Sequence, residues 1–274
     1  RKLFEIVREM DGEMTLESID SQWVKVKSGK SNFRLSCLST DDFPVWPSFK
    51  TTDEIEIASS LLLEMIDKAI FAAGESDTRY VLNGLLFHIK TDGTLTVVGT
   101  DGHRLALSKK NIGSKSKEEK KMIVSRKSVA ELRRFLTDGS KVVKVIVGKN
   151  HILFTIDDIE FLTRLIEGTY PNYEQVIPTS NEKILAVDRN LLTRSLRRVS
   201  IMSRERSNAV KMDIDSNNII ISASNPDIGE ASDEIDVNYL GDAMTIAFNA
   251  RYILDVLNVM SSEKVILKFN EAHS

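Results

Sequence analysis

The densest group of chemically active side chains in this sequence is the run Thr100-Asp101-Gly102-His103-Arg104-Leu105. It brings together a carboxylic acid, an imidazole and a guanidinium, the side-chain types of a general acid, a general base and a charge stabiliser. Gly102, however, supplies the positive φ that a tight turn needs, and polar side chains in such turns bond the nearby backbone. Because no second acid–base partner can be identified, the run favours a structural turn. Catalysis by Asp101 and His103 is the weaker alternative.

No other motif indicates catalysis or a bound metal. The histidines show no metal-ligand spacing with Cys, Asp or Glu; they are His88, His103, His151 and His273. Neither a Gly-rich phosphate loop nor a Gly-x-Ser-x-Gly elbow is present. The lone cysteine, Cys37, excludes a disulfide framework and a four-thiolate metal site. The sequence therefore predicts a protein with no catalytic residues, no metal and no cofactor.

The elements that would position the Thr100–Leu105 turn belong to a long internal repeat. Helical patterns open at Arg1, Arg126 and Arg251, which are 125 residues apart. Other segments match at nearly the same period: 33–44 with 161–171, 95–101 with 219–225, and 59–73 with 188–202. A period of this length is too long for a solenoid repeat, so each repeat is expected to be a domain.

Within one repeat the sequence predicts two helices among many short strands. Runs rich in β-branched residues, bounded by Gly, Asn and Asp, occupy 142–147, 152–156, 161–166 and 219–223. Asp92-Gly93 between two apolar runs indicates a hairpin. The expected fold class is α+β with antiparallel sheets. The 274 residues are divided into 1–52, the rear part of a first domain, 53–178, a middle domain, and 179–274, a third.

Charge is segregated along the chain, although the total is close to neutral. The net charge of −3 argues at first against binding to nucleic acid. Two helical segments nevertheless carry a basic face opposite an apolar one; the basic residues are Arg126, Lys127, Arg133 and Arg134, then Arg189, Arg194, Arg197 and Arg198. For a single helix this pattern is typical of a solvated face. Repetition would align several such faces on one wall, which is the electrostatic signature of phosphate-backbone binding without base recognition.

Composition places the chain among ordinary globular proteins. Hydrophobic residues make up 42% and charged residues 28% of the sequence. No apolar run approaches the roughly 18 residues of a membrane span. The chain opens without a charged-then-apolar leader, and it has one cysteine, so the expected location is the cytoplasm.

The repeat, the basic helices and the turn converge on a resemblance to the bacterial DNA polymerase III β subunits, the sliding clamps. Thr100–Leu105 resembles the signature turn of that family, and Arg79-Tyr80-Val81-Leu82-Asn83-Gly84 its segment before a central strand. Tyr170-Pro171-Asn172-Tyr173 resembles its end-of-middle-domain motif, and 248–258 its last-domain helix. The resemblance covers essentially the whole chain. It implies a parent of three clamp domains, cut within the first and before the terminal tail of the third.

The resemblance implies a function without catalysis. Each clamp domain packs two helices on antiparallel sheet, and two chains close head to tail into a ring. The homodimeric ring encircles duplex DNA, whatever its sequence, and tethers the DNA polymerase III catalytic subunit. The residues expected to face DNA are Arg79, Tyr80, Arg126, Lys127, Arg133, Arg134, Arg189, Arg194, Arg197 and Arg198.

The family also carries a peptide groove between its middle and last domains, which binds the polymerase, the clamp loader and repair proteins. The matching residues here are Arg79, Leu82, Thr100, Gly102, His103, Arg104, Leu105, Pro171, Gln175, Val176 and Tyr252. Leu82, Leu105, Pro171 and Val176 could equally be plain core residues. Gln175 replaces an Arg of many members and Val81 a Tyr of some, which bears on peptide preference.

Ring closure in the family joins the first domain of one chain to the third domain of the other. The matching residues are Phe33 and Leu35, with Ile201 and Met202. Two other classes of function stay open at this point. A second buried acid beside Asp101 and His103 would favour an enzyme. A basic helix projecting into solvent would favour a regulatory protein that binds DNA.

Overall fold

The computed structural model describes residues 2–43, 45–47, 54–136, 141–178, 181–203 and 207–270. The chain divides into two compact units, residues 1–49 and 50–274. The expected domain limits at 52/53 and 179 lie outside the described residues, as do Arg1 and His273. The division at these positions therefore stays a prediction.

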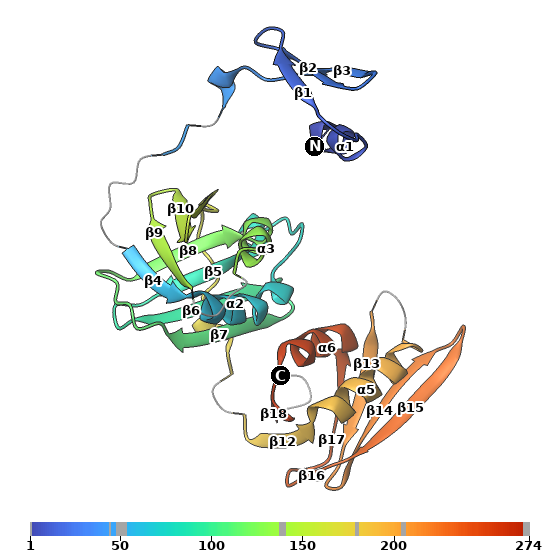
Figure 1. Ribbon diagram of the computed structural model, residues 1–274. Coiled ribbons are helices and arrows are strands. Elements are labelled where there is room, and N and C mark those ends of the chain that lie inside the picture. Colours follow the sequence, from blue (N-terminus) through green and yellow to red (C-terminus); the bar gives the residue numbers. More distant parts are fainter. Residues whose placement is uncertain are drawn as a thin grey trace. The chain divides into compact units, whose positions relative to one another are not determined.

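The first unit is a helix followed by a three-stranded sheet (Figure 1). Its elements are α1 (Lys2–Arg8), β1 (Thr15–Ser18), β2 (Trp23–Ser28), β3 (Ser31–Ser36) and the 3-10 turn η1 (Thr40–Asp42). The strands pair antiparallel in chain order. Leu3, Phe4 and Val7 form an apolar face of α1, but they are 39, 67 and 36% exposed. This unit leaves that face uncovered.

The first half of the second unit contains two four-stranded antiparallel sheets, β7-β6-β5-β8 and β11-β10-β9-β4. Its elements are β4 (Glu54–Ala58), α2 (Ser59–Asp67), η2 (Ile70–Ala72), η3 (Tyr80–Asn83), β5 (Gly84–Ile89), β6 (Thr94–Thr100), β7 (Leu105–Asn111), β8 (Lys120–Ser125), α3 (Arg126–Arg133), β9 (Val142–Val147), β10 (His151–Ile156), β11 (Ile159–Arg164) and α4 (Tyr173–Val176). The hairpin expected at Asp92-Gly93 is confirmed: it joins β5 to β6, and Gly93 has a φ of 85°.

The second half repeats the same design. Its elements are β12 (Lys183–Asp188), α5 (Arg189–Ser200), β13 (Ala209–Ile214), β14 (Asn218–Asn225), β15 (Gly229–Asp236), β16 (Asn238–Tyr239), β17 (Met244–Asn249), α6 (Ala250–Val259) and β18 (Lys264–Phe269). The sheet order β15-β14-β13-β17 corresponds strand for strand to β7-β6-β5-β8, and the pair β12-β18 corresponds to β4-β9. The helix and three strands of the first unit likewise follow the order of α3, β9, β10 and β11. The predicted repeat of an α+β fold is thus present in the topology.

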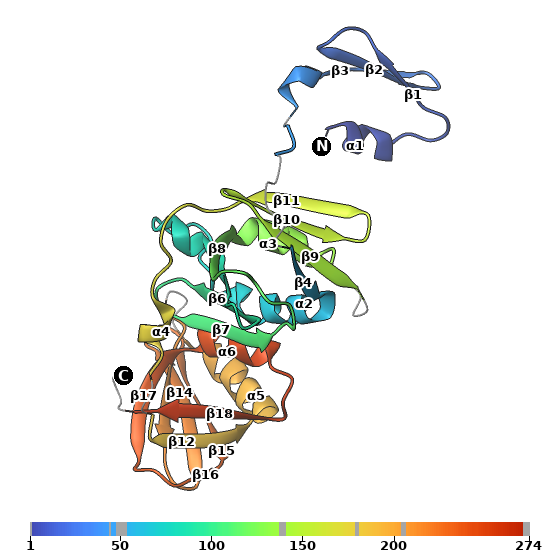
Figure 2. The same ribbon diagram turned by 90° about the vertical axis from the view of Figure 1, so that its left-hand side faces the viewer.

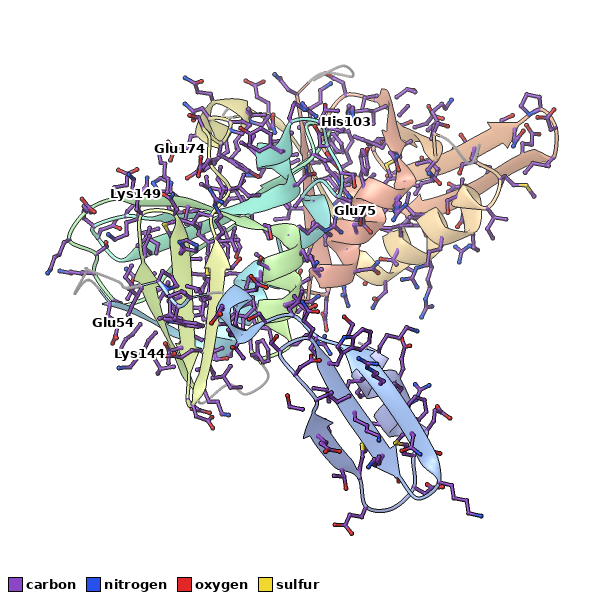
Figure 3. All side chains as sticks on the ribbon, turned by 90° about the horizontal axis from the view of Figure 1, so that it is seen from above. Glu54, Glu75, His103, Lys144, Lys149 and Glu174 are labelled. Atoms are coloured by element: carbon purple, nitrogen blue, oxygen red, sulfur yellow. The ribbon has the colours of Figure 1, made fainter. Side chains whose placement is uncertain are left out.

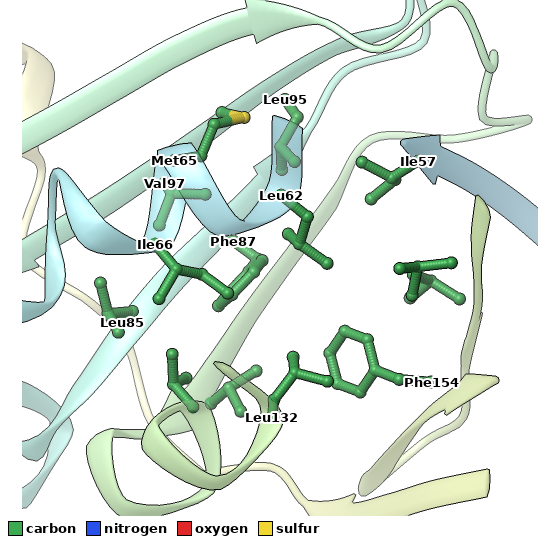
Figure 4. Close-up of a cluster of buried hydrophobic side chains, with 14 of the residues drawn as sticks. Ile57, Leu62, Met65, Ile66, Leu85, Phe87, Leu95, Val97, Leu132 and Phe154 are labelled. Carbon is green, nitrogen blue, oxygen red and sulfur yellow. The ribbon is translucent and has the colours of Figure 1, made fainter. Parts of the chain in front are cut away.

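Each half is held by one main apolar core to which its helices and sheets contribute, and the first half has a second, smaller cluster that includes Val98 and Tyr170. In the first half Leu62 and Ile66 of α2 and Leu132 of α3 pack with Phe87 of β5 and Phe154 of β10 (Figure 4). All five are at most 2% exposed. The basic helices α3 and α5 therefore lie against sheets through their apolar faces, and neither projects into solvent as an isolated recognition helix would.

A recurring junction, in which a strand leads directly into a helix through a polar cap, fixes where three helices begin. Ser125 ends β8 and accepts a bond from the amide of Ser128 in α3. Asp188 ends β12 and caps α5 by accepting from Leu191, at 2.8 Å. Asn249 ends β17 and caps α6. A side-chain cap satisfies an otherwise unpaired amide, so these positions locate each basic helix relative to its sheet.

Candidate functional site

The Thr100–Leu105 segment forms the tight turn that joins β6 to β7, as expected from its sequence. Gly102 has a φ of 84°. The hydroxyl of Thr100 donates to the carbonyl of Arg104 at 2.6 Å, and Asp101 Oδ1 accepts from the amides of His103 and Arg104 at 3.0 and 3.1 Å. Burial raises the pKa of Asp101, but these bonds and Arg104 lower it more, so the pKa lies below its usual value. The acid serves the turn as a carboxylate.

Arg104 ties this turn to α6 in the other half of the unit. Its Nη1 donates to Asp255 Oδ2 at 2.6 Å, its Nε to Asp101 Oδ2 at 3.1 Å and its Nη2 to the carbonyl of Phe71 at 2.7 Å. The guanidinium carbon also lies 4.5 Å from the ring centroid of Tyr252. Each guanidinium nitrogen thus has a partner within the chain. Figure 2 shows the proximity of β7 and α6 that this network spans.

Arg79 lies flat against the same turn. It makes a two-bond ion pair with Asp77, at 2.9 and 2.8 Å, and donates from Nη2 to the carbonyl of Asp101 at 3.1 Å. A Cβ added to Gly102 would meet both terminal nitrogens of Arg79 at 2.7 Å. The bond from Arg79 lowers the pKa of the Asp77 carboxyl to about 2. The positive φ therefore favours glycine at 102, and a side chain there would also displace the guanidinium of Arg79.

The apolar residues expected in the groove are divided between core and surface. Leu82 is 2% exposed, and Thr100 is 8% exposed, so both lie largely inside the fold. Leu105 is half-buried and packs on a small cluster that includes Val98 and Tyr170. Pro171, Gln175 and Val176 are exposed on the segment that leads into and forms α4. The structure thus brings Leu105 to the segment that contains Pro171.

Two cavities adjoin the turn, and each is lined from both halves of the unit. A cavity of about 490 Å³ is lined by the apolar residues Phe71, Leu105, Leu107, Val256 of α6 and Met260 just after it, and by the polar residues Lys68, Ser261 and Ser262. A polar cavity of about 520 Å³ is lined by Glu75, His103, Arg126, Arg251 and Asp255 among others. His103 and Glu75, both labelled in Figure 3, come from different loops. The turn therefore contributes Leu105 to a cavity of mixed lining and Asp101, His103 and Arg104 to a charged one.

Several of the basic residues of α3 are paired with acids. Arg126 binds Glu75 at 3.0 Å, Arg133 binds Asp67 at 2.6 Å, and Arg134 binds Glu131 at 3.1 Å. Lys127 is exposed and makes no ion pair with any described residue. Tyr80, in η3, is 61% exposed.

The same division holds on α5. Arg189 donates to the carbonyl of Met260, and Arg198 forms an ion pair with Asp233 of β15. Arg197 donates to the neutral side chain of Asn258 at 3.0 Å. Arg194 is exposed and, among the residues that the structure describes, has no acidic partner. Among the described residues, the positive charges of the two helices that no acid compensates are therefore Lys127, Arg189, Arg194 and Arg197.

The four residues expected at a subunit interface are accessible within their own units. Phe33 on β3 is 39% exposed, and Ile201, after α5, is 73% exposed. Leu35 and Met202 are half-buried. β3 and β15 each end their sheet, and β15 carries the acids Glu230, Asp233, Glu234 and Asp236. Both strands thus have one edge without a partner in the described sheets.

Sequence reasoning did not find Asp255, Phe71 and Asp77, which hold Arg104 and Arg79 in place. Asp255 is three positions after Tyr252, a spacing that puts both on one helical face, and this was the available signal. No group of three His, Cys, Asp or Glu side chains that could hold a metal ion occurs in the described ranges. Within the same ranges, no helix combines the length and apolar character that a membrane span requires.

Comparison with known families identifies both halves of the second unit. Residues 56–172 match the family described as DNA polymerase III beta subunit, central domain. Residues 174–274 match the corresponding C-terminal domain. Together the two matches cover more than half of the chain, in the order that the sequence resemblance implies.

Individual relatives agree along the whole chain. The beta sliding clamps of Pseudomonas putida and Escherichia coli K12 are each 35% identical, over 275 and 276 residues, covering 100% of this chain and 75% of theirs. The crystal structure of the Pseudomonas aeruginosa polymerase III subunit beta superposes with a TM-score of 0.90 at 34% identity, covering 100% of this chain and 75% of that one. The Bacillus subtilis clamp gives 0.89 at 28% identity, with 99 and 72% covered.

These matches confirm the resemblance inferred from the motifs and exclude the enzyme alternative. The chain belongs to the bacterial β sliding clamps, the non-enzymatic processivity factors of DNA replication.

Proposed function

We propose that the protein carrying this chain acts as a ring-shaped homodimer of three clamp domains per subunit, encircles duplex DNA and tethers the replicative polymerase. The observation that carries this proposal is the repeated topology of the two halves, each of which packs two helices on antiparallel sheet, one of them basic: α3 in the first half and α5 in the second. Because α3 and α5 are not equivalent helices of the repeat, the proposal places both helices of each half on the same wall. The bacterial cytoplasm, where the chromosome is replicated, is the proposed location.

The DNA-facing wall is proposed to act through a few uncompensated cations. Lys127, Arg194 and Arg197 supply attraction to phosphates that is independent of sequence and weakens with salt. Arg126, Arg133 and Arg198 contribute less net charge, because acids bind them. A wall with few free charges attracts DNA without a deep energy minimum at any register. This favours sliding over stationary binding.

The peptide groove is proposed to lie beside the Thr100–Leu105 turn. Leu105, Pro171 and Val176 offer apolar surface, and the neighbouring cavity of about 490 Å³, lined in part by Phe71 and Leu107, is large enough for side chains of a short peptide. Arg104 is proposed to shape the turn rather than to bind the peptide, since each of its guanidinium nitrogens has a partner within the chain. Arg79 is proposed to support the turn through its ion pair with Asp77 and its bond to the carbonyl of Asp101. His103 is exposed and is the residue of the turn proposed to contact the peptide backbone.

Ring closure is proposed to pair the free edge of β3 in one subunit with that of β15 in the other. Phe33 and Ile201 would bury apolar surface, and Arg34 of β3 would face the acidic residues of β15. Obligate interfaces of this kind bury more apolar area than transient ones.

The DNA proposal is tested by reversing three of the uncompensated charges together, Lys127→Glu, Arg194→Glu and Arg197→Glu. Arg189 is left unchanged because its guanidinium bonds the carbonyl of Met260. The matched control reverses Lys109, Lys115 and Lys117, three exposed lysines on β7 and the loop after it. Both proteins are loaded onto nicked circular plasmid by the clamp loader and followed by gel filtration. The helix variant is expected to lose retention on DNA and processive synthesis, whereas the control retains both. Equal behaviour of the two variants would contradict the assignment of the DNA-facing wall.

A further inference from the structure

We infer that His88, a buried histidine outside the family's recognised motifs, positions the short helix α4 that forms one wall of the peptide groove. It does so through a chain of hydrogen bonds from Tyr173 through His88 to Glu119. The groove itself is part of the proposed function, on which this inference rests. His88 would be a positioning residue, because it acts through Tyr173 and does not face the peptide.

The chain of contacts crosses three separate segments. His88 lies on β5 and is 1% exposed, and Tyr173 opens α4 and is 6% exposed. Nδ1 of His88 lies 2.8 Å from the hydroxyl of Tyr173, and Nε2 lies 2.5 Å from Oε1 of Glu119, just before β8. The two rings meet edge to face, with centroids 6.1 Å apart. A buried imidazole with a partner on each nitrogen is fixed in orientation.

The direction of the chain follows from the chemistry of its ends. The carboxylate of Glu119 only accepts, so Nε2 of His88 carries the proton that it shares with Glu119. In the neutral ring Nδ1 is then an acceptor, and the Tyr173 hydroxyl donates to it. The bond to His88 lowers the pKa of Glu119, and burial raises that of Tyr173, so both groups keep these protonation states near neutral pH.

α4 needs such an anchor because it cannot hold itself in place. It has four residues, and Asn172 before it makes no side-chain cap. An isolated helix of one turn is unstable in water. The link from Lys90 to Glu174, at 3.4 Å, is largely exposed and adds little, and Thr96 also bonds the side chain of Tyr173. The position of α4 therefore depends on the contacts that the buried side chain of Tyr173 makes inside the fold.

The groove wall follows directly from that anchor. Gln175 and Val176 are the last residues of α4 and are exposed, while Tyr173 points into the fold. Pro171 lies two residues before Tyr173, and Tyr170 is held separately by a bond from its hydroxyl to the carbonyl of Val98 at 3.3 Å. Loss of the hydrogen bond between Tyr173 and His88 would thus increase the mobility of Gln175 and Val176 most. Pro171 would be affected less, because Tyr170 holds the chain beside it.

The test removes one hydroxyl with Tyr173→Phe, which keeps the ring in its cluster. The matched control is Tyr239→Phe, which removes the hydroxyl of another buried tyrosine that donates to the carbonyl of Asp242 at 3.2 Å. Binding is measured with a fluorescent peptide carrying the clamp-binding segment of the polymerase III catalytic subunit. Tyr173→Phe is expected to weaken binding about fivefold, the effect of a hydrogen bond worth about 1 kcal/mol, and the control to leave it unchanged.

Hydrogen exchange without peptide separates this inference from the proposed groove. Tyr173→Phe is expected to speed amide exchange in residues 174–177, with 170–171 less affected. The double variant His88→Leu/Tyr173→Phe should bind no more weakly than the weaker single variant, because both break one chain. Because Tyr173→Phe also removes the bond to Thr96, exchange is measured in His88→Leu as well, and unchanged exchange in 174–177 of that variant would overturn the role of His88, whatever the peptide does. If exchange in 174–177 becomes faster but the unaltered protein binds no peptide, the proposed peptide groove is contradicted and the positioning of α4 by His88 and Tyr173 is supported.

Discussion

The link between Arg104 and Asp255 gives the sharpest test of how the two halves of the second unit are held together. Arg104→Ala removes an ion pair of 2.6 Å, the bond to the carbonyl of Phe71 and the stacking on Tyr252. Breaking one partner of a buried ion pair costs about 3–5 kcal/mol. The two side chains keep 18 and 27% of their surface exposed, so solvent screens the orphaned carboxylate. The expected loss in the free energy of unfolding is therefore about 2–3 kcal/mol.

A double-mutant cycle isolates the interaction itself. Arg104→Ala, Asp255→Ala and the double variant are unfolded with denaturant, and the non-additive part is expected to be about 1.5–2 kcal/mol. The exposed pair Arg134–Glu131, with side chains 74 and 50% exposed, is the control and should couple by less than about 0.5 kcal/mol. If Arg104 and Asp255 prove additive to within about 0.5 kcal/mol, the two side chains act independently and the reasoning fails.

Three further perturbations address the turn. Leu105→Asp is expected to weaken peptide binding at least tenfold and leave retention on circular DNA unchanged; equal peptide affinity in fluorescence anisotropy would remove Leu105 from the groove. Gly102→Ala should lower the free energy of unfolding by about 1–3 kcal/mol, since a side chain there is strained at positive φ and meets Arg79; a thermal midpoint equal to that of the parent protein would contradict this. Because the pKa of Asp101 is depressed in the folded state, its contribution exists above the unfolded pKa of about 3.9 and is lost as pH falls toward the folded pKa. Denaturant unfolding at pH 5 and pH 3 should show this loss, and Asp101→Asn should reduce it; an identical pH dependence in the variant would refute it.

Much of the fold could be predicted because its signals are local. Ser125 and Asp188 cap helices whose apolar residues recur at helical spacing, and Asp92-Gly93 marks a two-residue hairpin turn. Because the sequence repeats, an element predicted in one domain also predicts the corresponding element in the next domain. Strand order inside a sheet is not a local property, but the agreement of the two halves in topology shows that the repeat had been aligned correctly.

The candidate site was less predictable because its contacts join distant residues. Arg104 and Asp255 are 151 positions apart, and nothing near either residue identifies the other. The sequence also overestimates the net positive charge of α5. Arg198 forms an ion pair with Asp233, which lies on β15, a strand distant in the sequence. Leu82 shows a further limit. Its spacing suits a surface socket as well as a core, and its 2% exposure favours the core.

The uncovered face of α1 bears on how the chain unfolds. Within residues 2–43 and 45–47, Val26 is the only buried hydrophobic residue, whereas the second unit has two extensive cores. Fixing the backbone of one residue costs about 1–2 kcal/mol in entropy, which a segment with so little buried surface does not recover by its own contacts. A single melting temperature would therefore describe the second unit alone. The first unit should melt without a cooperative heat-capacity peak unless another surface covers Leu3, Phe4 and Val7.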